Sequence, residues 1–244
     1  LGPNGAGKST TMKMMVGYLI PDEGEITIDG MNFEQNDIEI KKLIGYMPEN
    51  NPLYKEMKVI EALRYSAMIN NVKNKQERID YVVKATALES VLAKSINELS
   101  KGYKQRVGLA ISLIHDPKIL ILDEPTEGLD PNQRSEIRNL IKDLGKERTV
   151  IISTHVLQEV EAMCNRIVII NQGNVVLDDS KENILKRANT NSEYKVSLKR
   201  LNKKIEELED SKQLHIASLE KNGDIETIIV ATDDSEKFIR TLNS

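Results

Sequence analysis

The sequence has no Trp, only two Phe and a single Cys among its 244 residues. The shortage of aromatic side chains removes the stacking platforms on which single-strand nucleic-acid binders rely. A lone cysteine, Cys164, excludes an internal disulfide and fits a reducing compartment, where its expected role is packing. With a net charge of -4, the composition implies no nucleic-acid partner, and we expect none.

Long apolar runs are also absent. The longest, Ile119–Leu122 and Ile167–Ile170, fall far short of the roughly 18 residues that a membrane-spanning helix needs. The sequence therefore predicts no membrane span of its own. The three histidines, His115, His155 and His215, are not at metal-ligand spacing and there is no cysteine pair, which argues against a zinc site.

What is present is an ordinary globular composition, with 39% apolar and 30% charged residues. Apolar runs bounded by turn residues alternate with segments of helical period up to about residue 187, which predicts an α/β domain with a largely parallel sheet. The segment Ala62–Leu92 has helical spacing and no strand-like run, so a helical insert is expected there. The predicted strands are Glu25–Asp29, Lys118–Leu122, Thr149–Ser153, Arg166–Asn171 and Asn174–Asp178.

The residues after Ala188 predict a second, smaller unit. The polar stretch Asn189–Ser192 is interpreted as a linker. An alternating run, a helical-period run and an Asn222-Gly223 hairpin signal then predict a β-α-β-β-α order. The alternating residues are Tyr194, Val196 and Leu198, and those at helical spacing are Leu201, Ile205 and Leu208. We expect residues 189–244 to be accessory, because they carry none of the motifs described below.

A complete P-loop opens the sequence at Gly2–Thr10. Its glycines let the backbone curl so that successive N–H groups face phosphate oxygens. Lys8 is expected to balance phosphate charge, Ser9 to ligate Mg²⁺, and the helix beginning near Lys8 to add its positive end. A glycine-rich helix cap is the alternative, but it would need neither the Lys-Ser pair nor the spacing. The predicted nucleotide contacts are Asn4, Gly5, Ala6, Gly7, Lys8, Ser9 and Thr10.

Two acidic residues end the apolar run Ile119–Glu124, as in a Walker B motif. A buried strand of an α/β sheet would deliver them to the ligand-binding edge. Asp123 would hold Mg²⁺, directly or through water, and Glu124 would act as the general base on the attacking water. Paired acids after a strand also cap helices, but a P-loop in the same chain favours the catalytic interpretation.

The octet Leu99–Arg106 predicts a capped helix with an exposed N-terminus. With Ser100 as the N-cap, the helix carries an apolar face and presents its positive end and the Ser hydroxyl to solvent, an arrangement that attracts anions. Taken alone, the octet would be a well-capped surface helix. The residues of the apolar face are Val107, Ala110, Ile111 and Ile114.

The octet resembles the signature motif of ABC ATPases, and it lies in the expected order between the P-loop and Walker B. Glu127–Asp130 resembles the D-loop, and Ser153–His155 resembles the switch region with its histidine. Over about residues 1 to 187 the chain is therefore identified as a member of this family. The resemblance implies an α/β fold: a P-loop NTPase core of residues 1–188, a helical signature subdomain at about 55–115, and a small α+β appendage.

The resemblance also implies how such a chain works. Two nucleotide-binding subunits, identical or close paralogues, would sandwich two ATP molecules, with Ser100 and Gly102 contacting the γ-phosphate held by the opposite subunit. Asp130 would line the dimer interface, and His155 would bind the γ-phosphate and position the water. Transmembrane permease subunits would be the other partners. They would hold the chain at the cytoplasmic face of the cell membrane, with membrane contact only through them.

One position departs from the family pattern. Glu49 stands where most ABC ATPases have the Q-loop Gln, and it can accept from a metal-bound water but cannot donate as Gln does. We expect it to be a catalytic and metal-site residue; the alternative is that it merely begins a loop. The segment Tyr46–Tyr54 is similar to ATPase subunits of gliding-motility-type transporters within the ABC-2 export group. Lys101 and Tyr103 in the signature fit the same group.

Three functions are compatible with these motifs: a transporter ATPase, a soluble ABC-type ATPase acting on DNA or ribosomes, and a regulator without turnover. The interval between Lys8 and Ser100 has no heptads, and the chain has one cassette, which disfavours the second. The presence of Glu124 and His155 disfavours the third. A P-loop follows a buried strand, and only Leu1 precedes Gly2, so we expect that strand and the adenine-stacking aromatic to lie upstream. As written, the chain is expected to aggregate and to bind ATP poorly.

Overall fold

The computed structural model describes residues 1–190, 192–199, 215–222 and 225–232. The chain divides into two compact units, Leu1–Asp178 and Asp179–Ser244. Each unit is described by itself. Among the described residues, no helix combines the length and the apolar character needed to cross a membrane.

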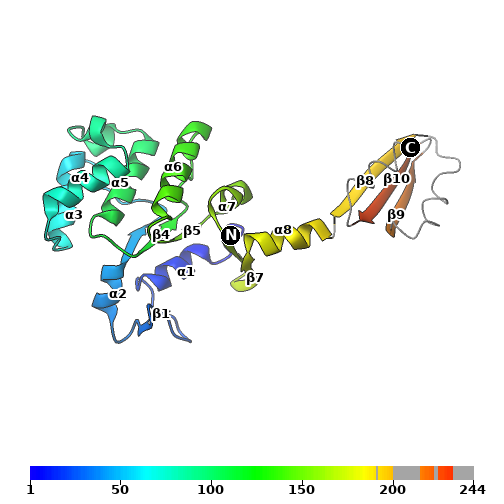
Figure 1. Cartoon of the computed structure of the whole chain (residues 1–244), viewed down its shortest axis with the longest axis horizontal. Helices are drawn as coiled ribbons and strands as arrows, with labels where there is room; N and C mark the ends of the chain where they lie inside the picture. Colours follow the sequence, from blue (N-terminus) through cyan, green and yellow to red (C-terminus); the bar gives the residue numbers. More distant parts are fainter. Residues whose placement is uncertain (191, 200–214, 223–224, 233–244) are drawn as a thin grey trace. The chain divides into compact units, whose positions relative to one another are not determined.

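The first unit is built on a parallel sheet of three strands in the order β3-β4-β5 (Figure 1). The strands are β3 (Ile44–Met47), β4 (Ile119–Asp123) and β5 (Thr149–Ser153). Met47 lies opposite Leu122, and Asp123 lies opposite Ser153. Because the strands are parallel and in register, all three end at the same edge of the sheet, which is where such sheets bind ligands.

Both faces of this sheet are covered, which explains why its strands are continuous apolar runs. Helices α1 (Lys8–Met15) and α2 (Asp37–Leu43) contribute Met12 and Ile40 to a buried cluster with Ile121 of β4. The neighbouring residues Leu120 and Leu122 point to the opposite face, into a larger cluster. That larger cluster also includes α6 (Pro131–Leu144), while α7 (Leu157–Met163) packs beside α6.

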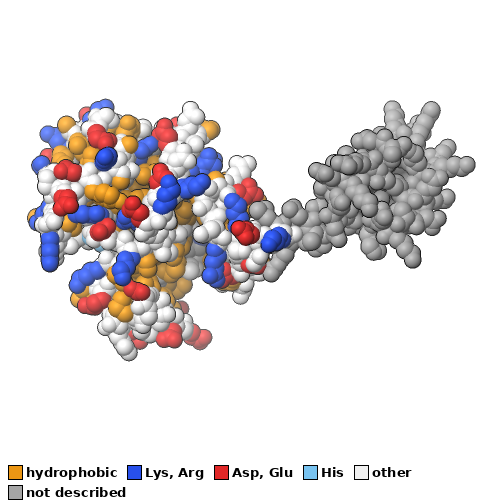
Figure 2. Space-filling view, viewed as in Figure 1, with side chains coloured by type: hydrophobic (Ala, Val, Ile, Leu, Met, Phe, Trp, Pro, Cys, Tyr) orange, Lys and Arg blue, Asp and Glu red, His pale blue; other side chains and the backbone are white. Residues whose placement is uncertain are grey.

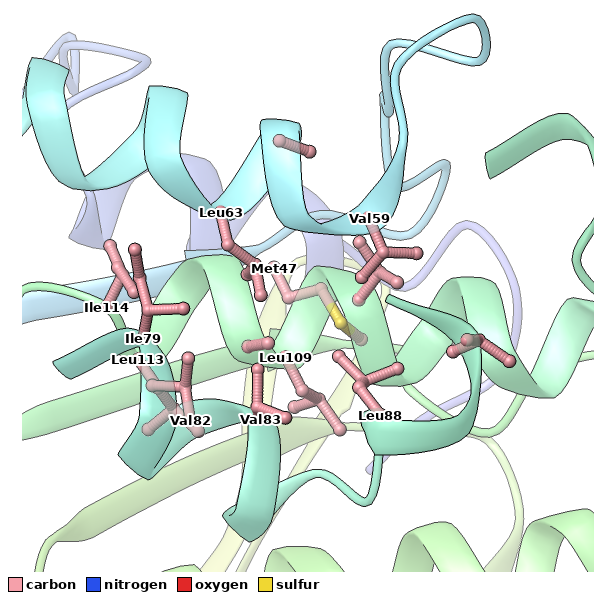
Figure 3. Close-up of a cluster of buried hydrophobic side chains, with 14 of the residues drawn as sticks. Met47, Val59, Leu63, Ile79, Val82, Val83, Leu88, Leu109, Leu113 and Ile114 are labelled. Carbon is pink, nitrogen blue, oxygen red and sulfur yellow. The ribbon is translucent and has the colours of Figure 1, made fainter. Parts of the chain in front are cut away.

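Residues 59–113 form the helical part of this unit. Figure 3 shows its core, where side chains of α3, α4 and α5 interdigitate and Met47 enters from the end of β3. The contact ties the helices to the strand that leads to Glu49. The elements are α3 (Val59–Ile69), α4 (Lys75–Ala85), the 3₁₀ turns η1 (Glu89–Val91) and η2 (Ile96–Glu98), and α5 (Lys101–Leu113). Acidic and basic side chains are interspersed over the visible face of the unit (Figure 2).

A hairpin closes the first unit. Strands β6 (Arg166–Asn171) and β7 (Asn174–Ser180) pair with each other and are joined by Gln172 and Gly173. Both turn residues have positive φ, 48° and 77°, as a type I′ hairpin turn requires. The Ile170 N–H donates to the Leu1 carbonyl at 2.8 Å, so the start of the P-loop segment lies beside β6.

The second unit contains α8 (Lys181–Thr190) and an antiparallel sheet in the order β8-β10-β9. Its strands are β8 (Ser192–Lys199), β9 (His215–Asn222) and β10 (Ile225–Thr232). The strand predicted around Val196 is confirmed, and Val196 pairs with Ile228. The helix predicted around Ile205 and the final helix lie outside the described residues.

Two predictions about elements are wrong in detail. Of the strand predicted at Glu25–Asp29, only β1 (Thr27–Ile28) forms, and it pairs with β2 (Met31–Asn32) across an Asp29-Gly30 turn in which both residues have positive φ. The linker predicted at Asn189–Ser192 is also wrong, because α8 runs to Thr190 and β8 begins at Ser192. Polar composition is shared by loops and by the ends of exposed helices, so it could not separate the two.

Candidate nucleotide site

A cavity of about 340 Å³ opens at the edge of the sheet where β3, β4 and β5 end. Four separate parts of the sequence meet there: the P-loop and the segments that follow β3, β4 and β5. The lining residues are Asn4, Gly5, Gly7, Lys8, Ser9, Thr10, Glu49, Glu124, Glu127 and His155. Most of the residues predicted from the P-loop, Walker B and switch motifs are therefore brought together.

The P-loop adopts a conformation that needs glycine. Gly5 has φ 79° and Gly7 has φ 105°, in the left-handed region that L side chains disfavour. The Ala6 N–H donates to the Pro3 carbonyl at 3.2 Å, and the Gly173 N–H donates to the Ala6 carbonyl at 3.0 Å. The hairpin turn of β6 and β7 therefore holds the loop in place. Ala6 itself is buried and does not line the cavity.

Lys8 is folded into the loop that precedes it. Its Nζ donates to the Gly2 carbonyl at 2.9 Å and to the Pro3 carbonyl at 3.2 Å. The same ammonium lies 3.5 Å from Glu124 Oε1, and both side chains are less than a tenth exposed. A buried ammonium held by carbonyl oxygens and a carboxylate is in a position to exchange those partners for phosphate oxygens.

Asp123 is the most enclosed acid at the site, with 1% of its surface exposed. Its Oδ1 accepts from the Ser9 hydroxyl at 3.1 Å and from the Ser153 hydroxyl. Ser153 in turn accepts the Glu124 N–H at 3.0 Å, which fixes the peptide between the two acids. The adjacent Ser9 hydroxyl and Asp123 carboxylate are hard oxygen donors of the kind that Mg²⁺ takes together with phosphates and water.

Glu124 lies between two basic side chains. His155 Nδ1 is 3.2 Å from Glu124 Oε1 and 3.1 Å from Oε2, while Lys8 approaches from the other side. Glu124 has φ 48°, a left-handed conformation that is uncommon for a residue other than glycine. The Glu124 side chain is 9% exposed and that of His155 is 41% exposed. An acid held by two partners and facing a polar cavity is arranged for proton transfer.

Residues 1–127 match the family model described as ABC transporter. The chain belongs to the ABC transporter family. It is 43% identical over 72% of its length to the "Uncharacterized ABC transporter ATP-binding protein YhcH" of Bacillus subtilis (strain 168). It is 37% identical over 91% of its length to the "Bacitracin transport ATP-binding protein BcrA" of Bacillus licheniformis.

Solved ABC structures share the fold. The dimeric, post-hydrolysis state of the ATP-binding cassette MJ0796, bound to ADP and Pi, superposes with a TM-score of 0.65 at 27% identity, covering 73% of this chain and 82% of that one. The predicted P-loop ABC core is thereby confirmed. The aligned segment spans 58% of YhcH and 72% of BcrA, so the curated relatives are longer than the part they share with this chain.

Three residues that the ABC resemblance assigns to the site do not line the cavity of their own chain. Ser100 is the N-cap of α5, where its hydroxyl accepts the Tyr103 N–H at 3.4 Å. Asp130 is the N-cap of α6, where its Oδ1 accepts the Gln133 N–H at 2.9 Å. Gly102 packs against the Gln133 side chain, and a Cβ on Gly102 would lie 3.1 Å from it. Within one chain these residues begin helices.

Sequence reasoning missed a buried hydrogen-bond network next to the nucleotide site. Glu159 is 2% exposed, accepts from the hydroxyls of Thr126 and Thr154, and lies 3.8 Å from Arg134 Nε. Thr154 precedes His155, so the network holds the segment that carries the switch histidine. Glu127, which lines the cavity, also had no predicted contact with the nucleotide. Glu159 is the first of two acids on the helix after the switch histidine, which is only a weak sequence signal for a buried network.

The carboxylates around the cavity repel one another. The pKa of Glu49 is raised, first by partial desolvation and then by the carboxylates of Glu127, Asp123 and Glu124. In the part of the chain that the structure describes, no three His, Cys, Asp or Glu side chains are grouped tightly enough to hold a metal by themselves. The Ser9 hydroxyl and the Asp123 carboxylate suit an ion that is held partly by phosphate oxygens, as Mg²⁺ is in nucleotide sites.

Proposed function

We propose that the chain binds and hydrolyses MgATP in a site completed by a second nucleotide-binding subunit, and that it drives export through separate permease subunits. The observation that carries this proposal is the position of the Glu124 carboxylate. This carboxylate lies between Lys8 and His155 in a cavity that the P-loop lines, and in the sequence Glu124 directly follows Asp123. The residues present fit the phosphates of ATP and a Mg²⁺ ion.

Binding uses the P-loop first. Phosphate oxygens replace the Gly2 and Pro3 carbonyls as partners of Lys8 Nζ, and the backbone N–H groups at the start of α1 face the same oxygens. Ser9 and Asp123 would hold Mg²⁺, which would neutralise negative charge on the phosphates when bound. Glu49 accepts a hydrogen bond from water on that side of the cavity.

Hydrolysis then depends on Glu124 and His155. The Glu124 carboxylate accepts a proton from the attacking water as the water oxygen bonds to the γ-phosphorus and the bond to the ADP oxygen breaks. His155 Nδ1 faces Glu124, so Nε2 is the ring atom left to face the γ-phosphate. Asp123 takes no proton in this account; its Oδ1 accepts from the Ser9 and Ser153 hydroxyls and holds both side chains in place.

A second subunit supplies what one chain lacks. Ser100 is exposed at the N-terminus of α5, outside the cavity of its own chain, so it is available to the γ-phosphate of a facing subunit. Gly102 in the same turn would allow close approach, and Asp130 would line the interface. The likeness to a dimeric cassette bound to ADP and Pi supports this arrangement.

A second groove offers a place for the permease. It measures about 680 Å³ and lies between α2 and the residues that join α3 to α4. Ile38 and Ile69 line it and are 64% and 57% exposed. Helix α2 leads directly into β3, which ends two residues before Glu49, so a displacement of α2 by the permease would reach the ATP site through this strand. Replacing both Ile38 and Ile69 by Glu should prevent copurification with the permease while ATP binding persists; unchanged copurification would argue for another docking surface.

Relatives and motifs together support export. BcrA is named for bacitracin transport, and the "Lantibiotic transport ATP-binding protein SrtF" of Streptococcus pyogenes is 37% identical over 75% of this chain. The Tyr46–Tyr54 segment resembles the ABC-2 export group. The subunit would then lie at the cytoplasmic face of the membrane, held there by the permease.

The test is ATP turnover by Glu124→Gln in the complete complex. The variant should bind ATP as the parent does but turn over roughly two to four powers of ten more slowly, the range for a positioned acid-base group. Glu147→Gln is the matched control, because Glu147 lies before β5, away from the edge that bears the cavity. Turnover by Glu124→Gln within twofold of the parent would reject Glu124 as the base.

A further inference from the structure

A side chain from the loop after Glu49 reaches into helix α5. Asn51 Nδ2 donates to the Lys104 carbonyl at 2.8 Å and lies 3.4 Å from Gln105 Oε1. Both acceptors belong to the early turns of α5, the helix whose N-cap is Ser100. Asn51 thus bridges two segments that are more than fifty residues apart in sequence.

Gly108 leaves room for the Asn51 amide because it has no side chain. A Cβ on Gly108 would lie 2.5 Å from both Nδ2 and Oδ1 of Asn51, closer than real Cβ contacts come. Gly108 is buried in the interior of α5, where glycine costs about 1 kcal/mol relative to alanine. The Asn51 amide occupies the space that an alanine methyl group would need at this position. The contact with Asn51 therefore explains why α5 has a glycine there, although glycine weakens the helix.

The backbone of Asn51 is tied to the ATP site. Its N–H donates to the Pro48 carbonyl at 3.0 Å and closes a turn in which Glu49 is the residue after Pro48. Asn51 has φ 40°, a left-handed conformation that asparagine tolerates better than most residues. Asn51 therefore closes the Glu49 turn with its backbone N–H and binds α5 through its side-chain amide.

We propose that Asn51 is a positioning residue that holds the Glu49 turn in a fixed position relative to α5, the helix that begins with the signature motif. Glu49 lines the ATP cavity of its own chain, while Ser100, the exposed N-cap of α5, would contact the nucleotide of the facing subunit in the proposed dimer. Through Asn51 the two groups move together, so a change at one ATP is passed to the other. The proposal rests on the two-subunit function proposed above.

The contact predicts a specific pattern among four variants. Asn51→Gly removes the side chain but keeps the positive φ, and Asn51→Asp keeps the shape but sets a carboxylate oxygen against the Lys104 carbonyl. Gly108→Ala places a methyl group where the Asn51 amide lies. In the double variant Asn51→Gly/Gly108→Ala, the amide is gone and the methyl group no longer clashes with it. Asn50→Gly is the matched control, because Asn50 is an exposed asparagine in the same turn.

The measurements are kcat and KM of the complete complex, ATP affinity of the isolated chain, and thermal unfolding. Each single variant at Asn51 or Gly108 should lower kcat about tenfold, the effect of losing roughly one hydrogen bond, while ATP affinity stays within about twofold. The double variant should be no slower than Asn51→Gly alone. Asn50→Gly should match the parent in all four quantities.

Two results would overturn the proposal. One is a Gly108→Ala defect that is as large in the Asn51→Gly background as in the parent, because the two residues would then act separately. The other is a loss of thermal stability in Asn51→Gly and Asn51→Asp with kcat equal to that of Asn50→Gly, because the contact would then serve stability alone. Glu124→Gln is included in the series: if it stays active, the proposed function fails, whereas a slow Glu124→Gln beside fully active Asn51 variants rejects this inference only.

Discussion

At the scale of single residues, Glu49 shows how repulsion among the carboxylates of the site affects the pKa of one of them. Desolvation, followed by the carboxylates of Glu127, Asp123 and Glu124, raises its pKa above the ordinary 4.5. A raised pKa means that ionisation of Glu49 is less favourable in the folded chain than in the unfolded one. Its effect on stability is therefore absent below the unfolded pKa, and it becomes a penalty as the pH rises through the folded pKa.

Glu49→Gln should consequently raise the melting temperature of the nucleotide-free chain at pH 7, because it removes a carboxylate from among like charges. The difference from the parent should shrink as the pH falls through the raised pKa of Glu49, because the carboxylate is then protonated and no longer meets its like charges. Thermal melts at several pH values measure it, with the exposed Glu56→Gln as a control. A difference that is absent at pH 7, or that grows in acid, would contradict this account of the charges.

Sequence reasoning reached some of these residues and not others for a physical reason. Lys8, Ser9 and Glu124 could be predicted because their chemistry depends on short spacings within one loop or at one strand end. Asn51 was visible in its motif but had no role, because its partner Lys104 comes from a helix that only the packed fold brings near. Contacts of this kind leave no pattern in local sequence.

At the scale of elements, the buried Glu159 joins four segments. It lies on α7, accepts from Thr126 after β4 and from Thr154 after β5, and approaches Arg134 of α6. Arg134 also donates to the Leu129 carbonyl at 3.2 Å, which extends the network to the segment before α6. The turn after Walker B and the switch segment are thus supported by the same carboxylate.

Glu159→Ala should lower the free energy of unfolding by roughly 2 to 4 kcal/mol, because it leaves two buried hydroxyls and a half-buried guanidinium without their acceptor. Denaturant unfolding of the chain measures it. Gln158→Ala on the same helix is the control, since Gln158 is exposed. A loss equal to that of the control would show that the network adds nothing to stability.

The elements themselves were predictable where the apolar pattern is continuous. Thr149–Ser153 and Arg166–Asn171 form strands with the predicted bounds, and β4 differs by one residue at each end because Asp123 still pairs with Ser153. The strand predicted at Glu25–Asp29 is shorter in the structure, because the Asp29-Gly30 turn ends β1 at Ile28 and leads into β2.

At the scale of the whole molecule, the residues that the structure describes as lining the ATP cavity, from Asn4 to His155, belong to the first unit. We propose that residues 189–244 are an accessory region, because the P-loop, Walker B and switch residues all precede them. A chain that ends at Asn189 should therefore bind ATP with unchanged affinity. Calorimetric titration of the two chains measures this, and a folded truncation that no longer binds ATP would place the second unit in the ATPase core.

The central claim is that each working site takes its P-loop from one subunit and its signature from another. Ser100→Arg places bulk and charge at the N-terminus of α5, and Lys8→Ala removes the ammonium of the P-loop, so each variant alone should be inactive. In a mixed dimer, one of the two composite sites keeps both Lys8 and Ser100. ATP turnover of the mixed complex is therefore the most direct measurement. The account predicts that mixing restores about one active site per heterodimer, and no recovery in a proven heterodimer would contradict it.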